Sequence, residues 1–247
     1  MSGIIDDAME RGLVGHNVVR DISRNRKSRD RTAKRQKGKL KIGVDIPLPE
    51  DIRQLIEGAT TPQWRALLIL LAFTGLRVSE ARGLRWDNVD LTKGKLRVCE
   101  RADRYLKIGR PKSISGERTV PLTTFVINTL KAWKLQCQKF ESDLVFPSPS
   151  GKPYYNSTVA RQGLIAAQGD KVKYTGIHCL RHFYASFCIN RQQDGGLGLP
   201  PKIVQERLGH ATLAMTMDTY GHLFPVEVDS EVEDAAVLRV ISGSRAY

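Results

Sequence analysis

The chain has 247 residues, with 39 lysines and arginines against 26 aspartates and glutamates, so its formal net charge is +13. Its 41% apolar and 26% charged residues are typical of a globular protein with a full core and exclude a disordered chain. The longest apolar run, residues 66–73, is too short for the roughly 18 residues of a membrane span. The acidic N-terminus is no secretory signal, so we expect an intracellular protein with no membrane partner, and the charge favours nucleic acid.

The N-terminal residues predict a helix followed by a strongly basic segment. Residues 1–19 carry a net charge of −2, and Ile4, Ala8 and Met9 belong to an amphipathic helical pattern. Residues 20–41 hold 11 basic and two acidic residues, and their only large aliphatic residues are one isoleucine and one leucine. Such a stretch buries too little apolar surface to offset its ordering entropy, so we expect a mobile tether.

The basic segment has two interpretations. It is either a solvated linker or, as we prefer, a strap that lies along the phosphates of a nucleic acid. The residues expected to contact DNA in the second case are Arg24, Arg26, Lys27, Arg29, Arg31, Lys34, Arg35, Lys37 and Lys39.

Helices are predicted over most of the remaining chain. Pro49 and the two carboxylates after it open one helix, and residues 62–73 form another that is apolar on nearly every side and therefore buried. The Thr74–Arg77 turn breaks this helix, and we expect Ser79 to cap a short helix as far as Leu84. Further helices are predicted at residues 124–139, 156–168, 178–190, 201–208 and 213–222, with loops at 147–153 and 191–200.

Residues 95–122 have a different pattern, in which single apolar residues stand among turn residues. This pattern predicts short antiparallel strands with a turn at Ser115-Gly116. The fold class that follows is α+β, a mostly α-helical domain with a small antiparallel β-sheet.

Two features that resemble metal sites do not predict one. Cysteines 99, 137, 179 and 188 form no CxxC pair, which indicates reduced, mostly buried thiols rather than a disulfide or zinc framework. His178 and His182 are spaced like zinc ligands on a helix, but Cys179 stands where a metalloprotease has its glutamate. Arg181 and His178 are better suited to holding a phosphate, so we expect no metal and no cofactor.

Five motifs in order give a more specific indication than any one of them. They are Thr74-Gly75-Leu76-Arg77-Val78-Ser79-Glu80, a lysine between short strands, His178-Cys179-Leu180-Arg181-His182, Leu208-Gly209-His210 and Thr219-Tyr220-Gly221-His222. In this order and spacing the chain resembles the tyrosine recombinases, closest to phage-type integrases, over about residues 46–225.

The resemblance implies a set of site residues. The implied catalytic residues are Arg77, Lys112, His178, Arg181, His210 and Tyr220, with Glu80 and His182 in support. Lys112 precedes an arginine and a Val-Pro-Leu strand, as the family's lysine does, and Lys107 is the alternative.

The implied function is that of a site-specific DNA recombinase or integrase catalytic domain, which cleaves and rejoins strands through a 3′-phosphotyrosine without metal or ATP. The residue types suit this chemistry, because ionising a tyrosine of pKa near 10 at pH 7 costs roughly 4 kcal/mol and needs nearby positive charge or a base. The alternatives are a DNA-binding remnant that does not cleave, and a topoisomerase of type IB.

The resemblance also implies an organisation and partners. Residues 1–19 would be the last helix of a core-binding domain, 20–45 a basic linker, 46–225 the catalytic domain, and 226–247 an acidic tail. The tail is either loosely docked or packed on a neighbouring protomer. The expected partners are double-stranded DNA and further copies of the chain, as a tetramer on DNA, in the bacterial cytoplasm and associated with the nucleoid. Most of the core-binding domain would be missing from this chain, either through truncation or as a natural remnant.

Overall fold

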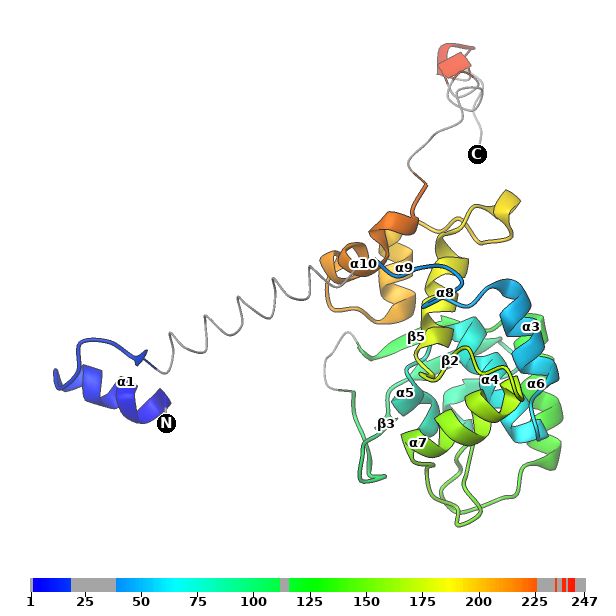
Figure 1. The fold of residues 1–247 in the computed structure, drawn as a ribbon, viewed down its shortest axis with the longest axis horizontal. Helices are drawn as coiled ribbons and strands as arrows, with labels where there is room; N and C mark the ends of the chain where they lie inside the picture. The colour runs from blue at the N-terminus through cyan, green and yellow to red at the C-terminus, as the bar shows by residue number, and fades with distance from the viewer. Residues whose placement is uncertain are drawn as a thin grey trace. The chain divides into compact units, whose positions relative to one another are not determined.

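The computed structural model describes residues 2–18, 39–111 and 116–225, together with residues 234, 237, 238 and 240–242 (Figure 1). The chain forms two units, Met1–Lys39 and Leu40–Tyr247. The first unit contains α1 (Ser2–Glu10), where the sequence predicts an amphipathic helix. Of the predicted DNA-contacting residues in the basic segment, Lys39 is described and exposed, and the others lie outside the described residues.

The core of the second unit is built around α4 (Pro62–Thr74). The Thr61 hydroxyl caps this helix by accepting from the amide of Trp64 at 3.2 Å, and Pro62 occupies the first turn. Every residue from 66 to 72 is buried, because α4 packs against α3 (Pro49–Glu57), α6 (Thr124–Gln136) and α8 (Cys179–Ile189) (Figure 1). This confirms the prediction of a buried helix.

Gly75 ends α4 in a conformation that other residues rarely adopt. Its φ is 62°, in the left-handed region, and a Cβ atom there would lie 2.3 Å from Cδ1 of Tyr184 on α8. Only glycine therefore allows the chain to turn here while α8 remains closely packed, and this turn leads directly into Arg77.

The predicted small sheet is present and antiparallel. Strands β1 (Val89–Asp90), β2 (Lys95–Val98) and β5 (Arg118–Pro121) pair in the order β1-β2-β5, with Leu96 opposite Val120 and Val98 opposite Arg118. A separate pair joins β3 (Arg101–Ala102) to β4 (Ile108–Gly109). The α+β prediction is confirmed, but Ser115 of the predicted turn lies outside the described residues.

The predicted helices of the second half have their expected positions, with different ends. The helix at α6 stops at Gln136 rather than at residue 139, because Cys137 adopts an extended conformation. Residues 156–168 form three successive helical segments, α7 (Asn156–Thr158), the π-helical η3 (Val159–Ile165) and η4 (Ala166–Gln168). The last two helices are α9 (Pro201–Leu208) and α10 (Leu213–Tyr220), followed by η6 (Gly221–Leu223).

The predicted cap at Ser79 is wrong. The short helix α5 (Val78–Arg82) has Arg77 as its N-cap, and the Glu80 carboxylate accepts from the Arg77 amide at 2.8 Å. Because Glu80 already accepts from this amide, which has no partner within the helix, a serine cap is not needed. In the described part of the chain, no helix combines the length and the apolar character needed to cross a bilayer.

Candidate active site

Three arginines from distant parts of the sequence meet at the C-terminal end of α9. Nε of Arg118 donates to the carbonyl of Arg207 at 2.8 Å, and Nη2 of Arg77 donates to the carbonyl of Gly209 at 3.3 Å. Between them, Nη2 of Arg181 donates to the carbonyl of Leu208. These carbonyls are consecutive at a helix end, where backbone acceptors are unpaired and the helix dipole is negative, so the end of α9 is a natural anchor for cations.

The two arginines predicted for catalysis differ in their exposure. Arg181 is 2% exposed, and its Nη1 also donates to the carbonyl of Gly75 at 2.5 Å. The side chain of Arg77 is 36% exposed. Arg77 thus has donors that remain accessible, whereas Arg181 is fixed between the ends of α4 and α9.

Glu80 joins Arg77 to Arg118. Its Oε1 lies 2.9 Å from Nη1 of Arg77, and its Oε2 lies 2.9 Å from Nη2 of Arg118. Burial raises the pKa of this carboxyl, but the hydrogen bonds and charge of Arg118, followed by Arg77, hold the pKa of Glu80 below its usual range. Glu80 is therefore an ionised carboxylate that holds two guanidinium groups.

Three of the four histidines in the motifs lie beside these arginines. The rings of His178 and His182 are 4.8 Å apart in an edge-on arrangement. Burial and the neighbouring arginines, Arg181 first, lower the pKa of both His182 and His210, the latter to about 3. The pKa of His178 is also lowered, to about 4, by burial and then by His182 and Arg181. These rings are neutral at pH 7 and offer hydrogen bonds rather than charge.

Tyr220 is the most enclosed member of the group. It is 1% exposed, ends α10, and packs with Tyr184, Cys188 and Leu208. Its hydroxyl lies 2.8 Å from Nδ1 of His182, and its ring is parallel to that of His210 at 6.3 Å. Burial raises the pKa of Tyr220 to about 12, against the opposing charges of Arg181 and Arg77.

The structure thus brings together seven of the eight residues predicted for the catalytic and supporting set. They are Arg77, Glu80, His178, Arg181, His182, His210 and Tyr220. Lys112 lies outside the described residues. The alternative, Lys107, is exposed between β3 and β4, where its backbone exchanges hydrogen bonds with Asp103.

Two further residues reach the site without having been predicted. Arg118 lies two residues before the buried Val120, on the same face of β5. This alternation in the sequence could have indicated that the arginine is buried and needs a carboxylate partner. Thr216 stands one helical turn before Tyr220, and its hydroxyl lies 2.9 Å from Nδ1 of His210. The four-residue spacing of Thr216 and Tyr220, which places both on one helical face, was the signal in the sequence that could have indicated this residue.

No cluster of three or more potential metal ligands occurs among residues 2–18, 39–111, 116–225 and the described tail residues. Cys179 and Cys188 are buried and Cys99 and Cys137 are partly buried, all as free thiols. The site itself is rich in nitrogen donors and has one carboxylate already held by two arginines, a composition that suits an anion.

The order of these motifs and their convergence are matched by a family. A sequence profile described as "Phage integrase family" matches residues 48–226, which is most of the chain. The chain belongs to the phage integrase family. It is 34% identical over 173 residues to tyrosine recombinase XerC of Xylella fastidiosa, covering 70% of this chain and 52% of that protein.

Other members support the same family. A XerC-like tyrosine recombinase of Caldanaerobacter subterraneus is 27% identical over 219 residues, covering 79% of this chain and 54% of that one. The solved structure of the Tn1549 transposon integrase in complex with circular intermediate DNA shares the fold, with a TM-score of 0.59 and 19% identity over 79% of this chain and 67% of that one. This integrase-family chain spans about half the length of the curated relatives it matches.

The lowered histidine pKa predicts an acid-sensitive fold. Below about pH 6.5 the unfolded chain binds protons that folded His210 does not take up until about pH 3, so falling pH favours unfolding. The contribution is at most about 1.4 kcal/mol per pH unit for this histidine. Urea unfolding between about pH 7 and 5 should show a stability loss that is smaller in His210→Asn. An identical pH slope in the two proteins would contradict the neutral, buried ring.

Proposed function

We propose that this chain is the catalytic domain of a site-specific DNA recombinase, in which Tyr220 attacks a DNA phosphate and forms a 3′-phosphotyrosine. The observation that supports this most is a buried phenol that is hydrogen bonded to a neutral histidine and lies close to the anchored Arg77 and Arg181. The oxygen of Tyr220 would bond to phosphorus, the bond to the 5′ oxygen would break, and that oxygen would leave as a hydroxyl.

The charges of the site suit a phosphodiester. Arg77, Arg118 and Arg181 contribute three positive charges, and Glu80 contributes one negative charge, which leaves an excess of two. A phosphodiester carries one negative charge, and the non-bridging oxygens gain more as the nucleophile attacks. Fixed donors around those oxygens stabilise the transition state more than the ground state.

Attack requires Tyr220 to lose its proton. With a pKa of about 12, ionisation at pH 7 would cost about 7 kcal/mol. His182, 2.8 Å from the hydroxyl, is placed to accept this proton as attack proceeds, since its lowered pKa keeps the ring neutral. We assign phosphate contacts to Arg77, Arg181, His178 and His210, and protonation of the leaving 5′ oxygen to Lys112.

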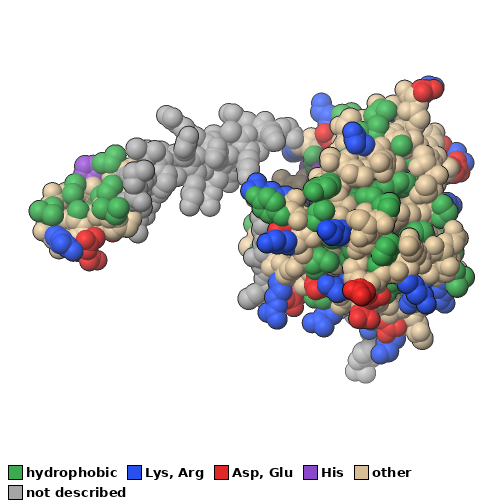
Figure 2. Space-filling view, turned by 90° about the horizontal axis from the view of Figure 1, so that it is seen from below, with side chains coloured by type: hydrophobic (Ala, Val, Ile, Leu, Met, Phe, Trp, Pro, Cys, Tyr) green, Lys and Arg blue, Asp and Glu red, His purple; other side chains and the backbone are tan. Residues whose placement is uncertain are grey.

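The proposed substrate is double-stranded DNA inside a bacterial cell. Lys and Arg side chains are spread around the edge of the second unit on the face seen in Figure 2. The relatives include a recombinase and a transposon integrase, the latter solved with DNA. Since the overall charge is +13, an anionic polymer is the expected partner, and the site then selects its phosphates.

Trapping of a covalent adduct tests the assignment. The substrate is a pool of labelled duplexes with a randomised segment and a nick just downstream of it, so that cleavage releases a short 5′-hydroxyl fragment that diffuses away. Wild-type protein should give an SDS-stable protein–DNA band, and sequencing the trapped ends reports the site. Tyr220→Phe should give none, since the nucleophilic oxygen is absent.

A matched control uses another tyrosine. Tyr105→Phe removes a hydroxyl from a side chain that is 66% exposed, and it should retain the adduct. Persistence of the adduct in Tyr220→Phe would contradict the nucleophile. DNA binding without an adduct in wild type would support the non-cleaving alternative, and relaxation of a plasmid without a specific site would support the topoisomerase alternative.

The basic segment is proposed as a strap on DNA phosphates. Replacing the lysines and arginines of residues 24–41 by glutamine should weaken binding to the same duplexes. The slope of log K against log salt should become shallower by about 0.9 for each phosphate that the segment no longer neutralises. A variant with the same residues in shuffled order should keep the slope, because the effect depends on charge. An unchanged slope in the glutamine variant would leave the segment as a linker.

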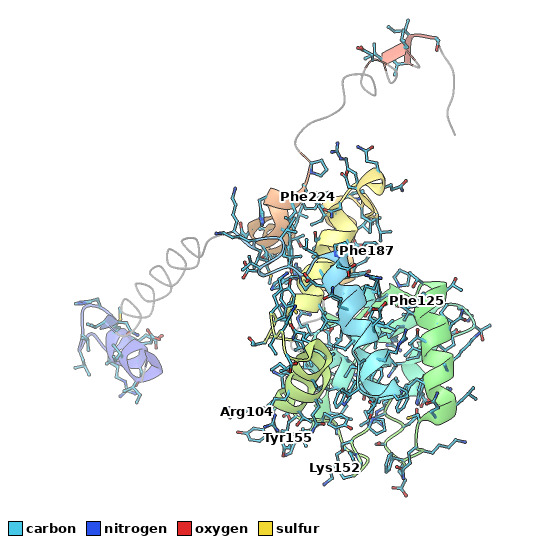
Figure 3. The ribbon with its side chains drawn as sticks, turned by 45° about the vertical axis from the view of Figure 1, so that its right-hand side comes forward. Arg104, Phe125, Lys152, Tyr155, Phe187 and Phe224 are labelled. Carbon is cyan, nitrogen blue, oxygen red and sulfur yellow. The ribbon has the colours of Figure 1, made fainter. Side chains whose placement is uncertain are left out.

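We further propose that the chain works as a tetramer on DNA, with residues 226–247 of one copy docked on the next. The apolar residues described in this segment are exposed, Leu238 by 65% and Ile241 by 77%, and the segment has five carboxylates and two arginines. The proposed acceptor is a groove of about 460 Å³ between α3, α4, α6 and α8. Phe125 and Phe187 line this groove (Figure 3), and the charges of Arg53 and Arg65 in it are balanced by Glu57 and Asp194. The proposed contact is therefore apolar.

Sedimentation of the DNA complex tests this docking. A chain ending at Pro225 should bind DNA as a smaller assembly than the full chain. Phe125→Ser, which alters a side chain that is 50% exposed in the groove, should have the same effect on the full chain. Tetramers formed equally well by both variants would show that the tail and groove do not join the copies.

A further inference from the structure

We propose that Arg118 is a positioning residue of this site, which sets the places of Arg77 and His210 through its contacts with Glu80 and with the end of α9. The inference rests on the proposed function for its kinetic consequence, but its structural basis does not depend on a DNA reaction. Arg118 acts through other residues and is not proposed to touch the phosphate.

Four of the five N–H donors of Arg118 are used within the protein. Nη1 and Nη2 bind the two oxygens of Glu80 at 3.2 and 2.9 Å, and Nη1 also lies 3.2 Å from the carbonyl of Gly116. Nε binds the carbonyl of Arg207 at 2.8 Å. Arg181 uses only two of its five donors, on the carbonyls of Gly75 and Leu208, so Arg118 has less to offer an incoming phosphate than Arg181.

Glu80 transmits the position of Arg118 to Arg77. Each Glu80 oxygen accepts one bond from Arg118 and one from Arg77, the latter from Nη1 to Oε1 and from the backbone amide to Oε2. The carboxylate is therefore saturated by two arginines. Without Arg118, the buried Glu80 carboxylate would keep only its bonds to Arg77 among these contacts. Arg77 would then move toward the carboxylate.

The second connection runs to His210. Gly209 has a φ of 63°, and a Cβ atom there would lie 2.8 Å from Nη1 and 3.0 Å from Cδ of Arg118. The Leu208-Gly209-His210 turn thus fits closely against this arginine. Arg118 holds the carbonyl of Arg207 before the turn and packs on Gly209 within the turn. It therefore fixes the position of His210, which is the next residue.

The kinetic test separates chemistry from binding. Arg118→Lys keeps the charge but loses the two-pronged contact, and Arg118→Met removes both. We expect single-turnover adduct formation on the trapped duplex to fall by about 10²-fold, as for a misplaced catalytic group, with little change in DNA affinity. Lys93→Met, on the surface and paired with Asp90, should match wild type. Wild-type rates in both Arg118 variants would overturn the proposal, as would an equal loss of affinity.

A double-mutant cycle tests whether Arg118 acts through Glu80. If it does, Glu80→Gln and Arg118→Met should each lower the rate, and the double variant should be little worse than either single one. Additive effects would mean that Arg118 acts independently of the carboxylate and would contradict the proposal.

A titration without DNA distinguishes failure of this inference from failure of the proposed function. Glu80 faces Arg77 from its own helix, Arg118 from β5, and Arg181 and His178 from the region of α8. Because Arg118 is the largest influence that lowers the pKa of Glu80, the carboxyl signal in NMR should titrate at higher pH in Arg118→Met. An unchanged Glu80 titration, in a variant that remains folded, would overturn the inference even if wild type forms the adduct.

Discussion

The C-terminal end of α9 is the element on which the rest of the site depends. Three consecutive carbonyl groups there accept hydrogen bonds from Arg118, Arg181 and Arg77, and the next residue is His210. Like charges held this close repel one another, so they need acceptors that are fixed and partly negative. The helix end supplies three, and Glu80 adds the one carboxylate. The protein thereby keeps a positive site assembled before any phosphate arrives, which is what electrostatic preorganisation requires.

The same packing holds the nucleophile in a state of low reactivity. Tyr220 lies in a small apolar cluster with α8 and α9, and this burial raises its pKa to about 12 although two arginines oppose it. The hydrogen bond to His182 and the parallel ring of His210 orient the phenol without ionising it. In the proposed reaction, bonding to phosphorus would supply the driving force for proton loss, because the phenol oxygen gives up its proton as the new bond takes up its negative charge. Reactivity would then be confined to DNA that is correctly bound.

Much of the fold followed from local patterns. The start of α3 at Pro49, the buried α4, and the full extent of α9 were predicted because proline, apolar periodicity and capping residues act over a few positions. The prediction of a cap at Ser79 was wrong because the Glu80 carboxylate accepts from the Arg77 amide at the start of α5. The same carboxylate binds Arg118 on β5, which lies far along the chain. The π-helical segment at Val159–Ile165 was not predicted either, and there Gly163 packs against the ring of Trp64.

Local sequence features were sufficient for the chemical inventory of the site: an arginine after a Thr-Gly-Leu turn, a His-x-x-Arg-His helix start, a Leu-Gly-His turn and a tyrosine one short helix later. Their order was enough to indicate a family. The folded chain was needed to show that Arg118 joins them, that Glu80 is shared between two guanidinium groups, and that Arg77 and Arg181 share one helix end. The contacts of Arg77 and Arg181 with that helix end join residues 132 and 27 positions apart. No local pattern specifies them, because they form only when the core around α4 brings α5, β5, α8 and α9 together.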